Sequence, residues 1–212
     1  MGNLLTVIYY TSNREDEAFE SRIQETLLES IGDLPLISVS QKPIDFGENI
    51  CVGDIGASAE NVLLQVRAGA MAATTPFIVQ AEADCLYHKS YFDFKPERDD
   101  TIYYTDFFYL LWPEKPAKFY RKKRGDLSGF SGREYLIDVI DKINQKPFEH
   151  LSNVAKKLVR QEWFQNEIPV VSFKTRNGMH YGSTIRRNKN ERSLPYWGKP
   201  KDLIDKYIKG VL

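Results

Sequence analysis

Short apolar runs alternate with helical patterns over the first eighty residues. Three runs are dense in apolar and β-branched residues, as buried strands are: 4–10, 35–40 and 76–81. Between them, apolar side chains recur at helical spacing over 15–31 and 58–73, and Ser58 is a candidate helix cap. Strands that alternate with helices of this length favour a parallel sheet with helices on its faces.

The pattern changes after residue 100. Two further segments, 101–112 and 117–122, are rich in aromatic or apolar residues and predict strands of a mixed sheet. The remaining spacing predicts helices over 131–143, 151–164 and 201–209, and a late strand over 168–174. Because no internal repeat or linker interrupts the chain, we expect a single α/β domain over 1–212.

Composition and charge narrow the class of protein only a little. Lysine plus arginine equals aspartate plus glutamate at 29 each, so no net field favours nucleic acid or an acidic membrane. The two cysteines, Cys51 and Cys85, lack metal-ligand spacing and are typical of a reducing cytoplasm. The first apolar run is too short for a signal peptide or membrane span, so we expect a soluble cytoplasmic protein.

Two carboxylates, Glu82 and Asp84, follow the run 76–81. In an open α/β sheet, ligands bind beyond the carboxyl ends of the strands. Alternation sends both side chains to one side, where a divalent ion such as manganese or magnesium accepts oxygen from each. We expect a metal site that holds a diphosphate, with Asp84 as its main ligand. Glu82 is either a second ligand or a contact to the ribose or donor sugar, and a solvated strand edge is the alternative.

Other residues are candidates for the same sheet edge. His180 follows the last predicted strand, and a neutral imidazole binds divalent ions, so it is a candidate third ligand; a structural histidine is the alternative. Four residues are candidate nucleotide contacts, with an aromatic face for the base, short polar groups for its edge and a cation for phosphate: Tyr10, Thr11, Asn13 and Arg67. Tyr10 fits a core position equally well.

A longer pattern runs through the middle of the chain and comprises 68–73, 76–87, His88, Phe92, Asp93, Phe94, Pro96 and the pair Tyr103 and Tyr104. In this pattern the chain resembles the GT-A glycosyltransferases, and most of all a bacterial and phage branch with an acidic E-x-D-x-L-Y turn. The resemblance implies a Rossmann-like mixed sheet with helices on both faces. It also implies a nucleotide-sugar-binding half over 1–100, an acceptor half over 101–212, and transfer of a sugar from a donor such as a UDP-sugar to a hydroxyl acceptor.

The resemblance extends to 148–149 and 176–180, with departures. It implies that Glu149 is the general base of an inverting reaction, and a helix-capping glutamate is the alternative. Ala83 stands where the family often has histidine or aspartate between the two acids. Asn177 and His180 stand exchanged relative to the family's R-H-G-x-N segment, and residues 150–151 replace its proline and glycine.

Two basic runs, 118–124 and 186–192, lie in the expected acceptor half. Cations interleaved with aromatics can bind a phosphate backbone, so a hydroxymethylated base in phage DNA is one candidate acceptor. A saccharide is the other, and solvated loops are the alternative to both. A non-catalytic nucleotide-sugar-binding module also stays open, whereas the first strand lacks the glycine-rich phosphate loop expected of a nucleotidyltransferase.

Overall fold

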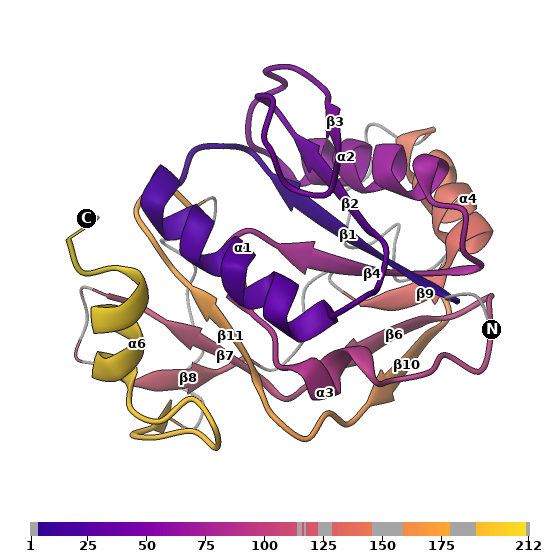
Figure 1. The fold of residues 1–212 in the computed structure, drawn as a ribbon. Helices are drawn as coiled ribbons and strands as arrows, with labels where there is room; N and C mark the ends of the chain where they lie inside the picture. Colours follow the sequence, from indigo (N-terminus) through magenta and orange to yellow (C-terminus); the bar gives the residue numbers. More distant parts are fainter. Residues whose placement is uncertain are drawn as a thin grey trace.

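Two β-sheets and the helices around them form the fold (Figure 1). The computed structural model describes residues 4–113, 116, 118–122, 129–145, 159–178 and 190–210. In this part of the chain the larger sheet, sheet A, has the order β10 (Gln161–Phe164), β6 (Ile102–Thr105), β9 (Phe130–Gly132), β4 (Phe77–Glu82), β1 (Leu5–Thr11), β2 (Leu36–Ser40), β3 (Glu48–Cys51). Sheet B has the order β12 (Asn190–Glu191), β8 (Phe119–Arg121), β7 (Phe108–Leu111), β11 (Val170–Phe173), β5 (Cys85–Leu86). The described helices are α1 (Glu17–Ile31), α2 (Ala59–Ala72), α3 (Lys89–Phe92), α4 (Arg133–Asn144) and α6 (Pro200–Tyr207).

The predicted parallel arrangement is confirmed in one half of sheet A. Strands β3, β2, β1 and β4 run parallel to one another, and β9 is antiparallel to both of its neighbours. Every residue of β1 is buried, which explains why its sequence is a continuous apolar run rather than an alternating one. The edge strand β3 was not predicted, because its four residues, Glu-Asn-Ile-Cys, form no apolar run; in the structure each of them is exposed or half-buried.

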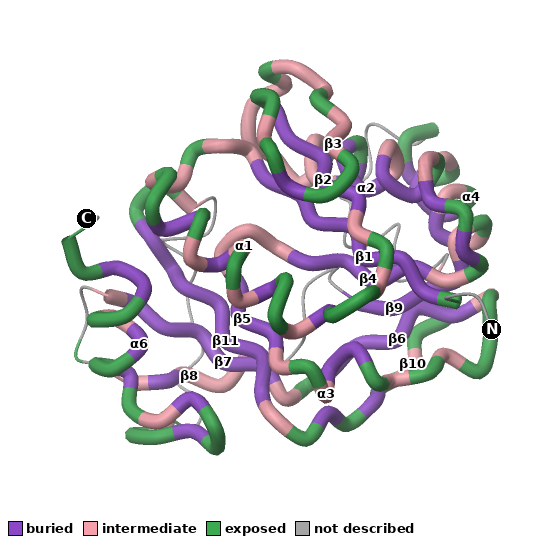
Figure 2. Tube along the Cα trace, in the orientation of Figure 1, coloured by how far each residue is buried: buried purple, intermediate pink, exposed green. Residues whose placement is uncertain are grey.

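Helices cover both faces of sheet A (Figure 1). On one face α2 and α4 pack on the sheet, with Leu63 and Ile140 in the same buried cluster as Ile8. On the other face Leu27 of α1 belongs to the cluster that contains Val7. The strands at the centre are accordingly the most deeply buried part of the trace (Figure 2). The predicted mixed sheet with helices on both faces is therefore confirmed.

A capping hydrogen bond explains where helix α2 begins, and a glycine explains how closely the helix packs on the sheet. The predicted cap is confirmed, because the Ser58 side chain accepts a hydrogen bond from the Asn61 backbone N–H. Gly69 faces the sheet, and a Cβ at this position would lie 2.6 Å from Cγ2 of Ile8. The absence of a side chain at residue 69 therefore permits the close approach of α2 to β1.

The aromatic run 101–112 forms two strands that belong to different sheets. It contributes β6 to sheet A and β7 to sheet B. Between them, the Thr105 Oγ1 accepts a hydrogen bond from the Phe107 backbone N–H at 3.0 Å, which turns the chain locally. Apolar content alone does not reveal this break, because both strands are buried.

The helix predicted over 151–164 is wrong at its end. Residues 161–164 form β10, which pairs parallel with β6, and 151–158 lie outside the described residues. Phe164 is buried and stacks on Phe94 with ring centroids 4.3 Å apart, whereas Trp163 is half exposed. The free edge of β6 and this alternation of exposure favour a strand. Within the described part of the chain, each helix is too short or too polar to traverse a bilayer.

Candidate functional site

The turn after β4 carries the chain from sheet A to sheet B. β4 ends at Glu82, β5 begins at Cys85, and Ala83 and Asp84 lie between them. The Glu82 backbone N–H donates to the Tyr87 hydroxyl at 3.2 Å, and the Phe173 backbone N–H donates to the Asp84 carbonyl at 2.8 Å. The two predicted acids are therefore held at the junction of the sheets.

Asp84 forms an ion pair with Lys174, the residue that follows β11. The Lys174 Nζ lies 3.2 Å from the Asp84 Oδ2, and their side chains are 7% and 17% exposed. Ser172 Oγ also donates to this oxygen, at 3.3 Å. Burial alone would lower the pKa of Lys174, but the negative charges of Asp84 and the neighbouring acidic groups, together with the hydrogen bond to Asp84, outweigh it and raise that pKa above its ordinary value. Lys174 is therefore positively charged at neutral pH.

Glu82, Asp84 and Cys85 form an acidic group that can hold a metal ion. Each offers one ligand atom, and these atoms lie within 4.8 Å of one another. Burial raises the pKa of the Cys85 thiol well above its ordinary value, and its Sγ donates to the Asp84 Oδ1 at 3.2 Å. A protonated thiol is a poor ligand, whereas two carboxylates suit a hard divalent cation. The residues present therefore fit a divalent ion through Glu82 and Asp84.

A second lysine from sheet B belongs to the same cluster of charges. Lys122 follows β8, and its Nζ lies 5.5 Å from the centre of the Phe108 ring. Burial lowers the pKa of Lys122, and the carboxylate of Glu82 opposes that shift. Two acids of the β4 turn are thus accompanied by two lysines that follow strands of the other sheet.

Glu15, just before α1, adds another carboxylate near this cluster. Its two carboxylate oxygens lie 2.6 and 2.8 Å from the Thr175 Oγ1, which donates to them. Burial raises the pKa of Glu15 from 4.5 to about 7, and the charge of Asp84 adds to this effect. A carboxyl group with this pKa exchanges its proton near neutral pH.

The predicted nucleotide contacts at the end of β1 lie beside the acidic turn. Tyr10 pairs in register with Glu82, so β1 and β4 end side by side. Tyr10 itself is buried in the cluster formed with α2 and α4, as its core interpretation predicts. The Asn13 Oδ1 accepts from the backbone N–H groups of Gln41 and Lys42, each at 2.8 Å.

Thr11 completes the loop, because its Oγ1 accepts from the Asn13 backbone N–H at 2.9 Å. Thr11 and Asn13 therefore connect the ends of β1 and β2, and their contact to a nucleotide stays a prediction.

Arg67 lies on α2 and forms two hydrogen bonds with Asp141 of α4, at 2.6 and 3.0 Å. Its predicted role in phosphate binding would require it to leave this pair. Glu149 and His180 lie outside the described residues, so their predicted roles stay predictions.

Sequence reasoning missed Lys174 and Glu15, and it assigned Lys122 only to the basic run 118–124. Both lysines stand at the ends of segments that were predicted as strands, 168–174 and 117–122. The rule that drew attention to Glu82 and Asp84, ligands beyond strand ends, applies equally to them. Glu15 lies at the start of the predicted first helix, where an acidic residue is common and gives no distinct signal.

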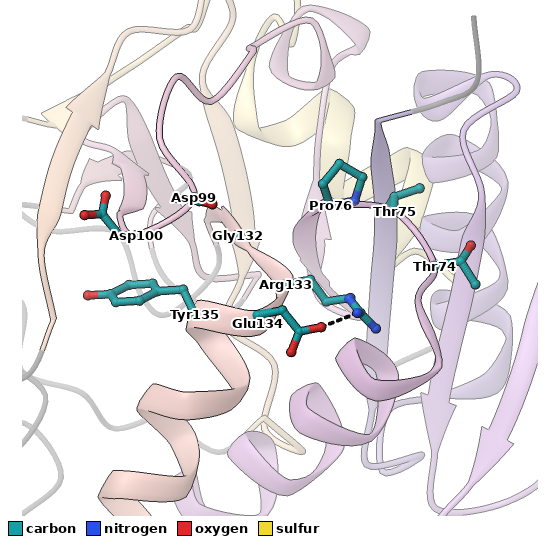
Figure 3. A pocket seen from close by; sticks show the side chains of 9 residues that line it. All are labelled: Thr74, Thr75, Pro76, Asp99, Asp100, Gly132, Arg133, Glu134 and Tyr135. Carbon is teal, nitrogen blue, oxygen red and sulfur yellow. Dashed lines mark hydrogen bonds and ion pairs between the residues drawn. The ribbon is translucent and has the colours of Figure 1, made fainter.

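A cavity of about 530 Å³ lies at the other end of β4 (Figure 3). Its walls come from the segment before β4, the segment before β6 and the start of α4: Thr74, Thr75, Pro76, Asp99, Asp100, Gly132, Arg133, Glu134 and Tyr135. Arg133 is already occupied by the Ala73 carbonyl and the Glu134 carboxylate. The cavity contains none of the predicted site residues.

Comparison with known proteins shows the fold. No family model matches the sequence, and no curated protein matches it significantly. S. aureus TarS residues 1–349, in complex with UDP-GlcNAc, is 12% identical, with a TM-score of 0.53 over 86% of this chain and 62% of that chain. The Aquifex aeolicus VF5 protein Aq1419 is 11% identical, with a TM-score of 0.50 over 76% of this chain and 87% of that chain.

The similarities extend to nucleotidyltransferases at a lower level. A nucleotidyl transferase from Methanothermobacter (Mth528) is 12% identical, with a TM-score of 0.49 over 79% of this chain and 89% of that chain. The chain spans less than two thirds of the TarS chain in the UDP-GlcNAc complex. At 11% and 12% identity, the similarity to Aq1419 and to TarS shows a shared architecture, and the predicted Rossmann-like GT-A fold is thereby confirmed.

Proposed function

We propose that this protein is a transferase that binds a nucleotide-sugar at the junction of its two sheets and moves the sugar to a hydroxyl acceptor. The observation that carries the proposal is the position of Glu82 and Asp84 at the carboxyl end of β4, with Lys174 paired to Asp84. In this fold class, that edge of the sheet is where ligands bind. The fold shared with TarS, whose structure contains UDP-GlcNAc, supports a nucleotide-sugar as the donor.

The chemistry of the site suits a diphosphate leaving group. When the bond to the sugar breaks, negative charge develops on the departing nucleoside diphosphate, and the ammonium groups of Lys174 and Lys122 can offset it. Glu82 and Asp84 would hold a divalent ion, manganese or magnesium, which when bound supplies a Lewis acid for the same charge. His180 is the proposed third ligand from the sequence.

The acceptor hydroxyl must lose a proton during transfer. Glu149 is the base that the family resemblance implies for an inverting reaction. Among the described residues, Glu15 is a carboxylate whose pKa of about 7 suits proton transfer at neutral pH. Changing each residue to glutamine distinguishes the two candidates. Only the substitution of a base that contacts the acceptor hydroxyl should lower kcat and leave donor binding intact.

The acceptor that we propose from the basic runs is a hydroxymethylated base in phage DNA, with a saccharide as the alternative. In the described part of the first run, Arg121 lies 3.3 Å from Asp106 and the Lys122 side chain is partly buried near Phe108. These two cations are thus already engaged by the protein. If DNA is the acceptor, its binding should weaken steeply as salt rises, whereas binding of a neutral saccharide should hardly change.

A release assay tests the proposed reaction. The protein is incubated with a panel of nucleotide-sugars and manganese, and release of nucleoside diphosphate is measured with and without candidate acceptors. A non-catalytic module should bind a nucleotide and release none. A nucleotidyltransferase should instead release pyrophosphate from a nucleoside triphosphate in the presence of a sugar phosphate. Either of these results would overturn the proposal.

A further inference from the structure

The carboxylate predicted to be the main metal ligand already has a partner of opposite charge. Lys174 Nζ lies 3.2 Å from the Asp84 Oδ2, and the Lys174 side chain is only 7% exposed. Solvent therefore screens this pair weakly, and a change in the charge of either member is costly unless another charge compensates it. Any cation that binds Asp84 must also lie close to an ammonium group.

This pairing makes the order of binding predictable from electrostatics. A divalent ion that enters alone adds positive charge next to Lys174, and no new anion is present to receive the ammonium. A diphosphate that enters alone adds negative charge next to Asp84 and Glu82. When both enter, the ammonium can turn to a diphosphate oxygen while the Asp84 carboxylate turns to the ion, so each charge is compensated.

We infer that Lys174 makes the binding of the divalent cation and of the nucleoside diphosphate depend on each other. This inference rests on the proposed function, since it assigns a role to Lys174 at the same site. The coupling is reciprocal, because a nucleotide that raises the affinity for the ion must be favoured by the ion to the same degree. Lys174 thus disfavours the ion in the absence of the diphosphate, whereas Asp84 and Glu82 disfavour the diphosphate in the absence of the ion.

The local structure supports an ammonium that can change partners. The Lys174 backbone is held, since its N–H donates to the Leu111 carbonyl at 2.8 Å. Asp84 keeps Ser172 Oγ as a second donor on the same oxygen, at 3.3 Å, when the ammonium leaves. A change of partner therefore concerns the lysine side chain alone, while its backbone stays hydrogen-bonded to Leu111 of β7.

Manganese titrations of the whole protein test the coupling. The probes are manganese chloride alone and manganese with each of UDP, GDP, CDP, ADP and dTDP, and unbound manganese is measured by its paramagnetic resonance signal. Wild type should bind manganese on the order of 10-fold more tightly with the preferred nucleotide than without it, within the range of measured allosteric couplings. Lys174→Met should bind manganese alone on the order of 10-fold more tightly than wild type and lose most of the effect of nucleotide.

Two further variants distinguish the loss of the Lys174 charge from a folding defect. Lys174→Gln keeps a hydrogen-bond donor for Asp84 without the charge and should behave as Lys174→Met does, whereas Lys174→Arg should retain the coupling. Lys201→Met, which removes a lysine paired with Asp205 on the exposed face of α6, is the matched control and should match wild type. Thermal unfolding of each variant confirms that it is folded.

The outcomes separate this inference from the proposed function. If both uncharged variants bind manganese alone no more tightly than wild type, or if wild type binds it equally with and without nucleotide, the coupling through Lys174 is refuted while the donor site can stand. If wild type binds none of the nucleoside diphosphates with or without manganese, the proposed function fails, and the coupling fails with it.

Discussion

Thr175 Oγ1 lies 2.6 and 2.8 Å from the two carboxylate oxygens of Glu15, and so joins the segment after β11 to the start of α1. The Thr175 hydroxyl also accepts from the Gly178 backbone N–H at 3.1 Å, which orders the chain just before residues 179–189. Burial and the nearby charge of Asp84 raise the pKa of Glu15, and the hydrogen bond from Thr175 offsets only part of this rise.

Glu15→Gln should change how stability depends on pH. The pKa of Glu15 is raised from 4.5 to about 7 in the folded protein, mainly by burial. Folded protein therefore keeps a proton that unfolded protein loses between these values, and stability falls as pH rises from about 4.5 to 7. After allowance for solvent screening, the wild type should lose about 1–2 kcal/mol over this window relative to Glu15→Gln.

Urea unfolding at pH 5 and pH 8 measures this difference. Glu25→Gln, on the exposed side of α1, is the matched control and should show the wild-type pH dependence. Equal pH dependence of the wild type and Glu15→Gln would contradict the assignment of a raised pKa to Glu15.

Asp84→Asn should abolish metal-dependent turnover and also lower stability. The loss of stability follows from the pair with Lys174, which the sequence does not reveal. Once the carboxylate is replaced by an amide, the buried ammonium loses its counter-charge, which should cost about 1–3 kcal/mol after allowance for the partial exposure of the pair. The double variant Asp84→Asn with Lys174→Met should recover part of that loss. A double-mutant cycle by urea unfolding measures the coupling, and additive losses would rule out the pair.

Arg67→Met should leave nucleotide binding unchanged. Arg67 forms a two-bond pair with Asp141 that connects α2 to α4, and both side chains are about one-third exposed or more. Its loss should lower stability only slightly, as for other exposed ion pairs. Calorimetric titration with nucleoside diphosphate and manganese checks the first expectation. A large loss of affinity would instead support the prediction from the sequence that Arg67 binds phosphate.

Gly69→Ala should destabilise the protein although alanine favours helices. A Cβ at this position would lie 2.6 Å from Cγ2 of Ile8 and 3.1 Å from Cγ2 of Val39, so α2 must move away from the sheet. Overpacking of this kind costs about 1–3 kcal/mol, which exceeds the gain of about 1 kcal/mol in helix propensity. Thermal unfolding measures the sum. Ala72→Ser, at the end of the same helix, is a control for substitution in α2 and should change stability much less.

The central elements of the fold follow from local pattern. β1, β2 and β4 are short and densely apolar, and Ser58 supplies an unambiguous helix start, so these elements are predictable within one or two residues. The exposed strand β3 and the strand β10 depend on a neighbouring edge that only the folded chain provides. Their hydrogen bonds, rather than their own composition, determine their conformation.

Only the part of the candidate site that lies at the end of a single strand could be predicted from the sequence. Glu82 and Asp84 are two positions apart at the end of β4, so their common location is visible in the sequence. The partner of Asp84 lies 90 positions later, at Lys174. No local rule connects residues at that separation, and so the charge compensation at this turn emerged from the tertiary structure alone.

The division of the site between the sheets has a mechanical consequence. The acids stand where β4 leaves sheet A, and the lysines follow strands β8 and β11 of sheet B. A bound donor that contacts both the acids and the lysines would restrict the movement of one sheet relative to the other. Amide hydrogens of β8 and β11 should then exchange with solvent more slowly when ligand is present, even though these strands lie far along the chain from the acidic turn.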